Sequence, residues 1–115
     1  MRVLALCAGG NVRSAAMAWR LKNCGVDAVP AGLIDNSPEL IRDIGRLVDK
    51  VIVMDKDLLP KLPAELLPKM ILADVGPDIW GNSLHPDLVK RIHTIHNVWN
   101  AQGRLSDISL RPVQT

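Results

Sequence analysis

The sequence predicts an α/β protein of one domain, with a four-stranded parallel sheet and helices on both of its faces. Short, continuous apolar runs alternate with helical patterns along the chain, which is typical of parallel strands buried on both sides. The length of 115 residues fits a single domain, and 48% apolar with 23% charged residues is an ordinary globular composition. We expect the domain to span residues 1–103, followed by a C-terminal tail over residues 104–115.

Four apolar runs are the predicted strands, and each is bounded by turn residues. Pro30 lies within the second run, so this strand is expected at an edge of the sheet, where a missing ladder donor is tolerated. Between residues 55 and 68, Pro60, Pro63 and Pro68 favour short helical turns over one long helix. The predicted strands cover residues 3–6, 26–31, 51–54 and 70–73.

Three helical patterns complete the domain. The first covers residues 14–24 and is stopped by Gly25; the second begins with Ser37 as its cap and Pro38 in its first turn. The third runs over residues 86–101 and is ended by Gly103. The positions predicted to face the core are Met17, Ala18, Leu21 and Cys24 in the first helix, Leu40, Ile41, Ile44, Leu47 and Val48 in the second, and Leu88, Val89, Ile92, Ile95 and Trp99 in the third.

Charge and composition exclude several classes of protein. Fourteen Lys and Arg against twelve Asp and Glu give a net charge of +2 with no basic stripe, so no nucleic-acid partner is expected. No apolar run approaches the roughly 18 residues of a membrane helix, and none resembles a signal peptide. Two cysteines are far short of a disulfide framework. We therefore expect a reduced, cytoplasmic protein without a membrane partner; the sequence leaves the oligomeric state open.

No metal or other cofactor is expected either. The three histidines have no Cys or Glu at ligand spacing. His93 and His96 lie one turn apart in the last helix and are predicted at the surface or the edge of the core.

The loop after the first strand carries the strongest functional signal. It reads Cys7-Ala8-Gly9-Gly10-Asn11-Val12-Arg13-Ser14 and lies between a buried strand and a helix start, where ligands bind in open α/β sheets. Two adjacent glycines allow successive backbone N–H groups to turn inward as an anion nest, and the helix adds its own free N–H groups. The loop therefore predicts a binding site for a phosphate-sized anion.

Three side chains of this loop suit phosphoryl chemistry. Cys7 lies in a positive field that favours its thiolate, which is the nucleophilic form of cysteine. Arg13 can hold two phosphoryl oxygens with its planar fork, and Ser14 can donate a hydrogen bond to the sulfur. Cys24, by contrast, falls on the apolar stripe of its helix and is expected to pack, with a redox partnership with Cys7 as the alternative.

The spacing Cys7-x5-Arg13-Ser14 resembles the phosphate-binding loop of the low-molecular-weight protein tyrosine phosphatases. Three further stretches agree in order: Ala31-Gly32 after the second strand, 49–55 ending in Met-Asp, and 77–81, which is similar to the family's acid loop. The resemblance covers most of residues 1–101. The chain departs from the family pattern at Gly10, Val12 and Ala15, where relatives usually carry Asn, often Cys, and Pro.

The resemblance implies a phosphatase fold and a two-step phosphoryl transfer from a phosphorylated protein or small molecule, phosphotyrosine included. Cys7 would attack phosphorus, Arg13 would clamp the phosphoryl oxygens, and Asp78 would act as general acid and then base. The residues implied in phosphate binding are Ala8, Gly9, Gly10, Asn11, Val12, Arg13 and Ser14.

Other roles and functions stay open from the sequence. Asp74, directly after the fourth strand, is the alternative acid or a loop cap. Asp55 is expected to serve an ordinary turn, with a place at the rim of the site as the alternative. Trp80 is expected either to wall a pocket or to anchor its loop. The loop also resembles the phosphoryl-carrying cysteine loop of sugar phosphotransferase IIB domains, although Arg13 with Asp78 favours a phosphatase. A non-catalytic phosphate-binding module is a further alternative, whereas an arsenate reductase would need cysteines after Cys24.

Overall fold

The computed structural model describes residues 1–102 and shows a four-stranded parallel sheet in the order β2-β1-β3-β4. The strands are β1 (Arg2–Cys7), β2 (Asp27–Gly32), β3 (Lys50–Val53) and β4 (Met70–Leu72). The helices are α1 (Arg13–Asn23), α2 (Pro38–Leu47) and α3 (Pro86–Gln102), with the short 3₁₀ helices η1 (Lys56–Lys61) and η2 (Ala64–Lys69) between β3 and β4. The fold class, the strand positions within two residues, the edge position of the Pro30 strand and the short turns around Pro60 and Pro68 are thus confirmed.

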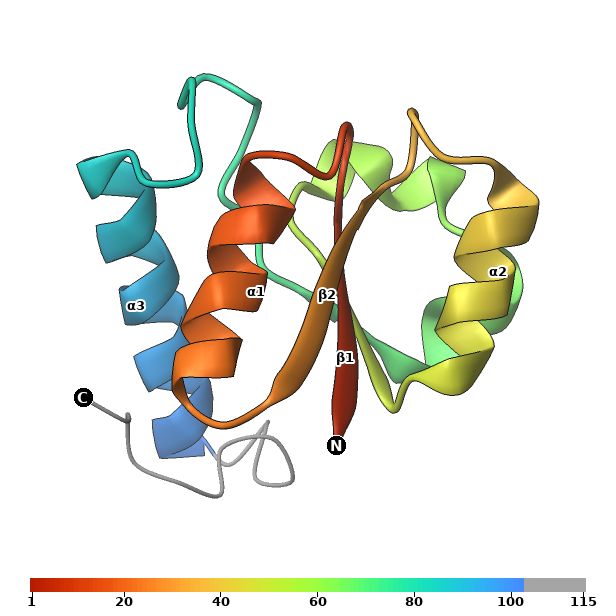
Figure 1. The fold of residues 1–115 in the computed structure, drawn as a ribbon, viewed down its shortest axis with the longest axis horizontal. Coiled ribbons are helices and arrows are strands. Elements are labelled where there is room, and N and C mark those ends of the chain that lie inside the picture. Colours follow the sequence, from red (N-terminus) through yellow and green to blue (C-terminus); the bar gives the residue numbers. More distant parts are fainter. Residues whose placement is uncertain (103–115) are drawn as a thin grey trace.

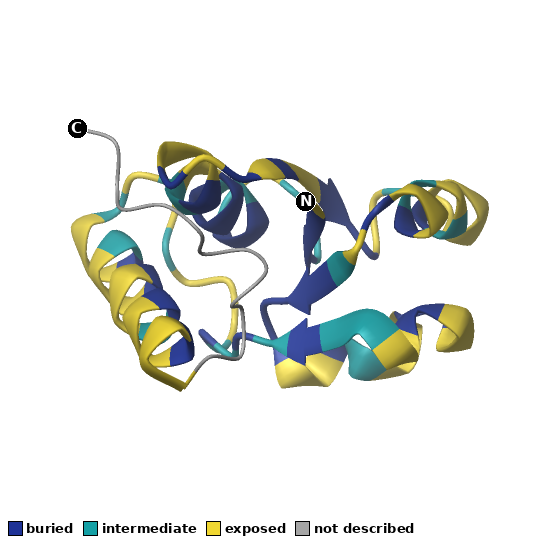
Figure 2. Cartoon of the chain, turned by 90° about the horizontal axis from the view of Figure 1, so that it is seen from below, coloured by how far each residue is buried: buried dark blue, intermediate teal, exposed yellow. Residues whose placement is uncertain are grey.

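Helices cover both faces of the sheet (Figure 1). Alternate residues of β1 enter two separate cores: Val3 and Ala5 pack with α1 and α3, whereas Leu4 and Leu6 pack with α2 and the 3₁₀ helices. Figure 2 shows the buried strands between helices whose outer surfaces are exposed. This arrangement explains why the strands are continuous apolar runs rather than alternating ones.

Local signals in the sequence explain where the helices begin and end. Ser37 caps α2 by accepting a hydrogen bond from the Leu40 N–H at 3.2 Å. Gly25 follows α1 with φ of 86°, a left-handed conformation that favours glycine. The expected stop of α3 at Gly103 and the tail at 104–115 lie outside the described residues.

Two expectations for the buried face of α2 are wrong. Leu40 and Leu47 are 43% and 69% exposed, although they were predicted to face the core. The helix instead packs through Ile41 and Gly45, where an added Cβ would lie only 2.5 Å from Leu66 Cδ2. Because α2 approaches Leu66 closely at Gly45, its buried face is turned away from Leu40 and Leu47. The small volume of the residue at position 45, rather than hydrophobicity, decides which face of α2 packs.

His96 also differs from its expected place. It is 1% exposed, on the same stripe of α3 as Leu88, Ile92 and Trp99, whereas His93 is exposed. The Nδ1 atom of His96 accepts a hydrogen bond from Arg20 Nε of α1 at 3.1 Å. A polar partner on the facing helix thus allows an imidazole to occupy a core position. The other expected α3 positions, Val89 and Ile95, are half-buried.

No helix within residues 1–102 has the length and apolar character needed to cross a membrane.

Candidate active site

Four loops meet at the carboxyl edge of the sheet, at the top of Figure 1. They are the β1–α1 loop (residues 8–12), the β2–α2 loop (33–37), the turn after β3 (54–55) and the long β4–α3 loop (73–85). Because all four strands are parallel, these loops lie at one edge, which is where ligands bind in open α/β sheets.

The β1–α1 loop is held tightly against the β2–α2 loop. The backbone N–H groups of Leu33 and Ile34 donate to the carbonyls of Cys7 at 2.7 Å and Ala8 at 3.0 Å. Gly10 has φ of 82°, and a Cβ there would lie 2.8 Å from the Ala31 carbonyl carbon. A Cβ on Gly32 would lie 2.5 Å from the Ala8 oxygen. Both glycines are therefore needed for this backbone path.

Cys7 lies at the end of β1 and is 2% exposed. Its Sγ accepts a hydrogen bond from the Gly10 N–H at 3.2 Å and lies 3.1 Å from Ser14 Oγ, within hydrogen-bonding distance. Burial raises the pKa of the Cys7 thiol, but the hydrogen bonds of Ser14 and Gly10 and the charge of Arg13 outweigh it, so the pKa is lowered from its ordinary value. The site therefore favours a thiolate.

Arg13 is the first residue of α1 and is 2% exposed. Its Nη1 donates to Asp55 Oδ2 at 2.8 Å and to the Gly76 carbonyl at 2.7 Å. Its Nε is also buried but has no hydrogen-bond partner among the described residues. One side of the guanidinium is thus fixed, while a buried N–H on the other side remains for an anion that the fork can accept.

Asp55 does more than the ordinary turn role expected from the sequence. Its Oδ1 accepts the Asp57 N–H at 2.9 Å and caps η1, while Oδ2 binds Arg13 in a nearly buried ion pair. Its place directly after a buried strand, at the same edge as Cys7, is the signal that could have identified it.

The remaining residues expected to bind phosphate line the same short loop. Ala8, Gly9 and Gly10 are half-buried, Asn11 is exposed, and Val12 packs against the core of α1 and α3. Val12 provides no side-chain cap to α1, and the first turn of that helix contains no acidic residue. The helix dipole therefore faces the loop without a competing carboxylate in that turn.

The two candidate acids have different environments. The half-buried Asp74 uses Oδ1 to accept the Gly76 N–H at 3.1 Å, which stabilises the turn whose carbonyl holds Arg13. Asp78 lies two residues beyond that turn, is exposed, and forms no side-chain hydrogen bond within the described part of the chain. The structure does not bring Asp78 into contact with Cys7, Arg13 or Ser14.

Trp80 anchors the loop that carries Asp78. Its ring is partly buried against the core and meets His85 edge-to-face, with the ring centroids 5.6 Å apart. Of the two roles considered for Trp80, contact with the core is the one observed.

Cys24 lies at the other end of α1 and is 3% exposed within the apolar core. The 11 residues of α1 span about 16 Å, so a disulfide between Cys7 and Cys24 would require large rearrangement. Cys24 is therefore a packing residue, because it lies too far from Cys7 for a redox partnership between the two cysteines.

Within residues 1–102, no cluster of three or more His, Cys, Asp or Glu side chains is arranged to hold a metal ion.

Comparison with known proteins places the fold but not the family. No protein-family model and no curated protein matches the sequence. The structure is similar to the tyrosine phosphatase Wzb from Escherichia coli K30, solved with phosphate, with a TM-score of 0.66 and 17% identity over 88% of this chain and 96% of that chain.

Two further solved structures support the same fold. A low-molecular-weight phosphotyrosine phosphatase from Vibrio cholerae O395 matches with a TM-score of 0.59 and 18% identity, covering 90% of this chain and 99% of the other. The YwlE arginine phosphatase from Geobacillus stearothermophilus matches with a TM-score of 0.55 and 17% identity, covering 90% and 96%. The chain therefore has the fold of the low-molecular-weight tyrosine phosphatases, as its sequence motifs predict.

Proposed function

We propose that this protein is a cysteine-dependent phosphatase that hydrolyses phosphate monoesters through a cysteinyl-phosphate intermediate. The observation that carries the proposal is the combination of a hydrogen-bonded Cys7, whose pKa is lowered, with an Arg13 whose buried Nε has no partner within residues 1–102. The fold shared with solved tyrosine and arginine phosphatases supports the reaction class. The proposed substrates are phosphorylated proteins or small molecules, phosphotyrosine among them.

In the first step, the Cys7 thiolate attacks phosphorus and forms an S–P bond as the P–O bond to the leaving group breaks. Asp78 protonates the departing oxygen, so the leaving group departs as a neutral alcohol or phenol. Arg13 and the loop N–H groups hold the equatorial oxygens, where negative charge is spread during transfer. Ser14 stabilises the sulfur while it carries negative charge.

In the second step, water attacks the phosphorus of the cysteinyl-phosphate. Asp78, now a carboxylate, accepts a proton from this water, and the S–P bond breaks to return the Cys7 thiolate and inorganic phosphate. The side chain of Asp78 is exposed, so it has access to solvent water. Asp74 is assigned to the loop turn, because its Oδ1 already accepts the Gly76 N–H.

The two anchors of Arg13 explain how the clamp is kept in place before substrate binds. Asp55 and the Gly76 carbonyl fix Nη1, so binding does not have to order this long side chain. The anchors also couple β3, α1 and the β4–α3 loop through one residue. We propose Asp55 as a positioning residue for the clamp.

The test is hydrolysis of p-nitrophenyl phosphate between pH 5 and 8 by the reduced native chain and by Cys7→Ser. Turnover by the native chain that vanishes in the variant is the expected result. If the folded, reduced native chain has no turnover, the phosphatase proposal fails. A titration with inorganic phosphate then separates a phosphate-binding module or carrier from a site that binds no anion.

A further inference from the structure

An exposed tryptophan on α1 marks a second surface, away from the reacting groups. Trp19 is 54% exposed, and Leu84 of the β4–α3 loop is 61% exposed beside it. Two hollows flank Trp19 and share Ser83: one of about 160 Å³ toward α3, and one of about 380 Å³ toward β2. We call Trp19, Leu84 and these two hollows the Trp19 surface.

The lining of the Trp19 surface is apolar with a basic rim. Ile92 and Val89 of α3 line the smaller hollow, and Pro30 of β2 lines the larger one. Among residues 1–102, no carboxylate lines either hollow, whereas the cationic side chains of Arg20 and Lys22 do. A ligand for this surface therefore combines a large apolar side chain with negative charge.

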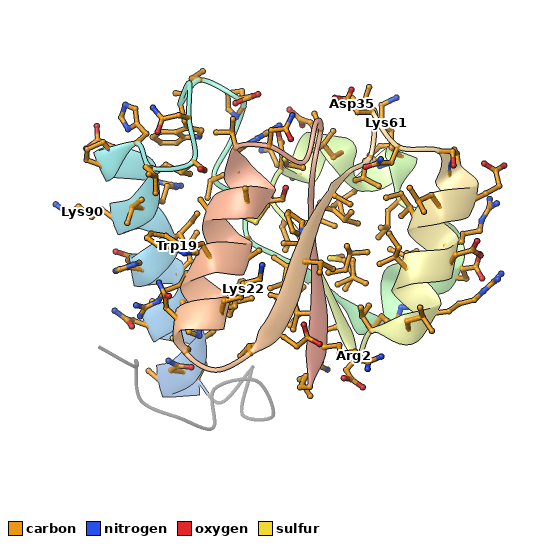
Figure 3. The ribbon with its side chains drawn as sticks, viewed as in Figure 1. Arg2, Trp19, Lys22, Asp35, Lys61 and Lys90 are labelled. Carbon is orange, nitrogen blue, oxygen red and sulfur yellow. The ribbon has the colours of Figure 1, made fainter. Side chains whose placement is uncertain are left out.

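In the part of the chain that the structure describes, the cation at this surface that is free to bind a partner is Lys22. Arg20 is engaged, because its Nε and Nη2 donate to His96 Nδ1 and Asn97 Oδ1. Lys22 lines the larger hollow and forms no salt bridge with any described residue, and Figure 3 shows it on α1, the helix that carries Trp19. Its ammonium group is available to a carboxylate of a partner.

The Trp19 surface lies close to the proposed active site along the chain. Trp19 lies six positions after Arg13 in α1, which is a rise of about 9 Å along the helix axis. An extended peptide covers that length with about three residues. Ser83 and Leu84 belong to the same loop as Asp78, so a ligand on this surface also contacts the segment that carries the proposed acid.

We propose that the Trp19 surface docks an acidic segment of a phosphoprotein substrate, about three residues from the phosphorylated side chain. One large apolar residue of that segment enters a hollow beside Trp19, and its carboxylates face Lys22. A nucleic acid fits less well, because its phosphates follow a continuous basic groove, whereas the lining here is mostly apolar. This docking role rests on the proposed phosphatase function.

The test compares phosphotyrosine peptides that differ only at the third and fourth residues after the phosphotyrosine. One carries Leu-Glu, one Ser-Ser and one Leu-Lys there. The native chain is expected to hydrolyse the Leu-Glu peptide with a kcat/KM about tenfold higher than that for the Ser-Ser peptide. An increase of this size is what a few desolvated contacts contribute to binding.

Variants of the surface separate docking from chemistry. Trp19→Ala is expected to remove most of that tenfold preference, and Lys22→Glu to favour the Leu-Lys peptide instead. Both variants should hydrolyse p-nitrophenyl phosphate at the native rate. Val98→Ala is the matched control, because Val98 is an exposed apolar residue of α3 that lines neither hollow.

The outcomes distinguish this proposal from the phosphatase proposal. Equal kcat/KM for the three peptides, with p-nitrophenyl phosphate turned over normally, would overturn the docking role alone. If nothing is hydrolysed, the unphosphorylated Leu-Glu peptide is titrated into the native chain while tryptophan fluorescence is measured, with Trp19→Ala as the blank. A change in Trp19 fluorescence that disappears in Lys22→Glu supports the docking role even though the phosphatase proposal has failed. No fluorescence change, or stronger binding of a single-stranded oligonucleotide, overturns the docking role.

Discussion

Two arginines on one helix show how differently the same side chain can be used. Arg13 and Arg20 lie seven residues apart on α1, and each reaches across to another element. Arg20 directs its Nε to His96 and Nη2 to Asn97 of α3. In the described part of the chain, Arg13 uses Nη1 to bind Asp55 and the Gly76 carbonyl, and its buried Nε has no partner. Arg20 therefore joins two helices, whereas we propose that Arg13 binds the phosphoryl group of a ligand.

The largest effect is expected from exchanging each arginine for lysine. Arg13→Lys keeps the charge but removes the planar fork, so kcat/KM for p-nitrophenyl phosphate should fall by about 10³-fold. Arg20→Lys should leave kcat/KM within about twofold, because that arginine contacts no group proposed to react. Steady-state kinetics and a phosphate titration on both variants check the contrast. Equal losses in the two variants would show that both arginines are structural.

Exchanging the two aspartates of the β4–α3 loop is expected to give the next largest effect. Asp78→Ala should lower kcat for phenyl phosphate by about 10²-fold, since its poor leaving group needs protonation. Asp74→Ala should cost less, because its Oδ1 caps a turn rather than serving the reaction. The measurement is kcat for phenyl phosphate and for p-nitrophenyl phosphate in each variant. A larger loss for Asp74→Ala, concentrated on phenyl phosphate, would assign the acid to Asp74.

Asp55→Asn tests the ion pair that holds Arg13 in place. Losing the charge that holds Arg13 Nη1 should lower kcat/KM by about tenfold and the free energy of unfolding by about 2 kcal/mol. Asp27→Asn is the matched control, because Asp27 pairs with Arg2 on the exposed surface at 3.6 Å. Urea unfolding and steady-state kinetics measure the two effects. Native kinetics in Asp55→Asn would contradict a positioning role.

The smallest effect on activity, but a clear one on stability, is expected at the partner of Arg20. Burial, and then the charges of Arg20 and His93, lower the pKa of His96 to about 4. Histidine in the unfolded chain has a pKa of about 6.5, so between about pH 4 and 6.5 the unfolded chain binds a proton at position 96 that the folded chain does not. The stability present above pH 6.5 is lost as the pH falls toward 4, by about 3 kcal/mol.

Urea unfolding at several pH values checks the prediction for His96. His96→Gln cannot titrate, so its stability should fall less steeply than that of the native chain between pH 6.5 and 4. Parallel curves for the two proteins would show that other groups cause the acid sensitivity. Activity at pH 7 should be unchanged in the variant.

The sequence predicted the sheet and the site loop because both depend on local patterns. Continuous apolar runs defined the strands, and the Cys7–Ser14 spacing, with two glycines, defined the loop that brings Cys7, Gly10 and Ser14 together. Pro30 identified an edge strand because a missing donor has the same meaning in any sheet. Signals of this kind are contained within a few residues.

What the sequence did not predict depends on contacts between distant elements. The pair of Arg13 with Asp55 joins residues 42 positions apart, and the burial of His96 depends on Arg20, 76 positions away. The exposure of Leu40 and Leu47 follows from the fit of Gly45 against Leu66. Periodicity describes which face of a helix is apolar, but the partner decides which part of that face is covered.

Trapping the cysteinyl-phosphate intermediate shows whether Cys7 becomes phosphorylated during turnover. Asp78→Ala, which should slow hydrolysis of the intermediate, is mixed with p-nitrophenyl phosphate, quenched within one turnover, digested and analysed by mass spectrometry. We expect one phosphoryl group on the peptide that contains Cys7, none on the peptide that contains Cys24, and none after Cys7→Ser. A phosphoryl group on another residue, or turnover with Cys7 never modified, would contradict this expectation.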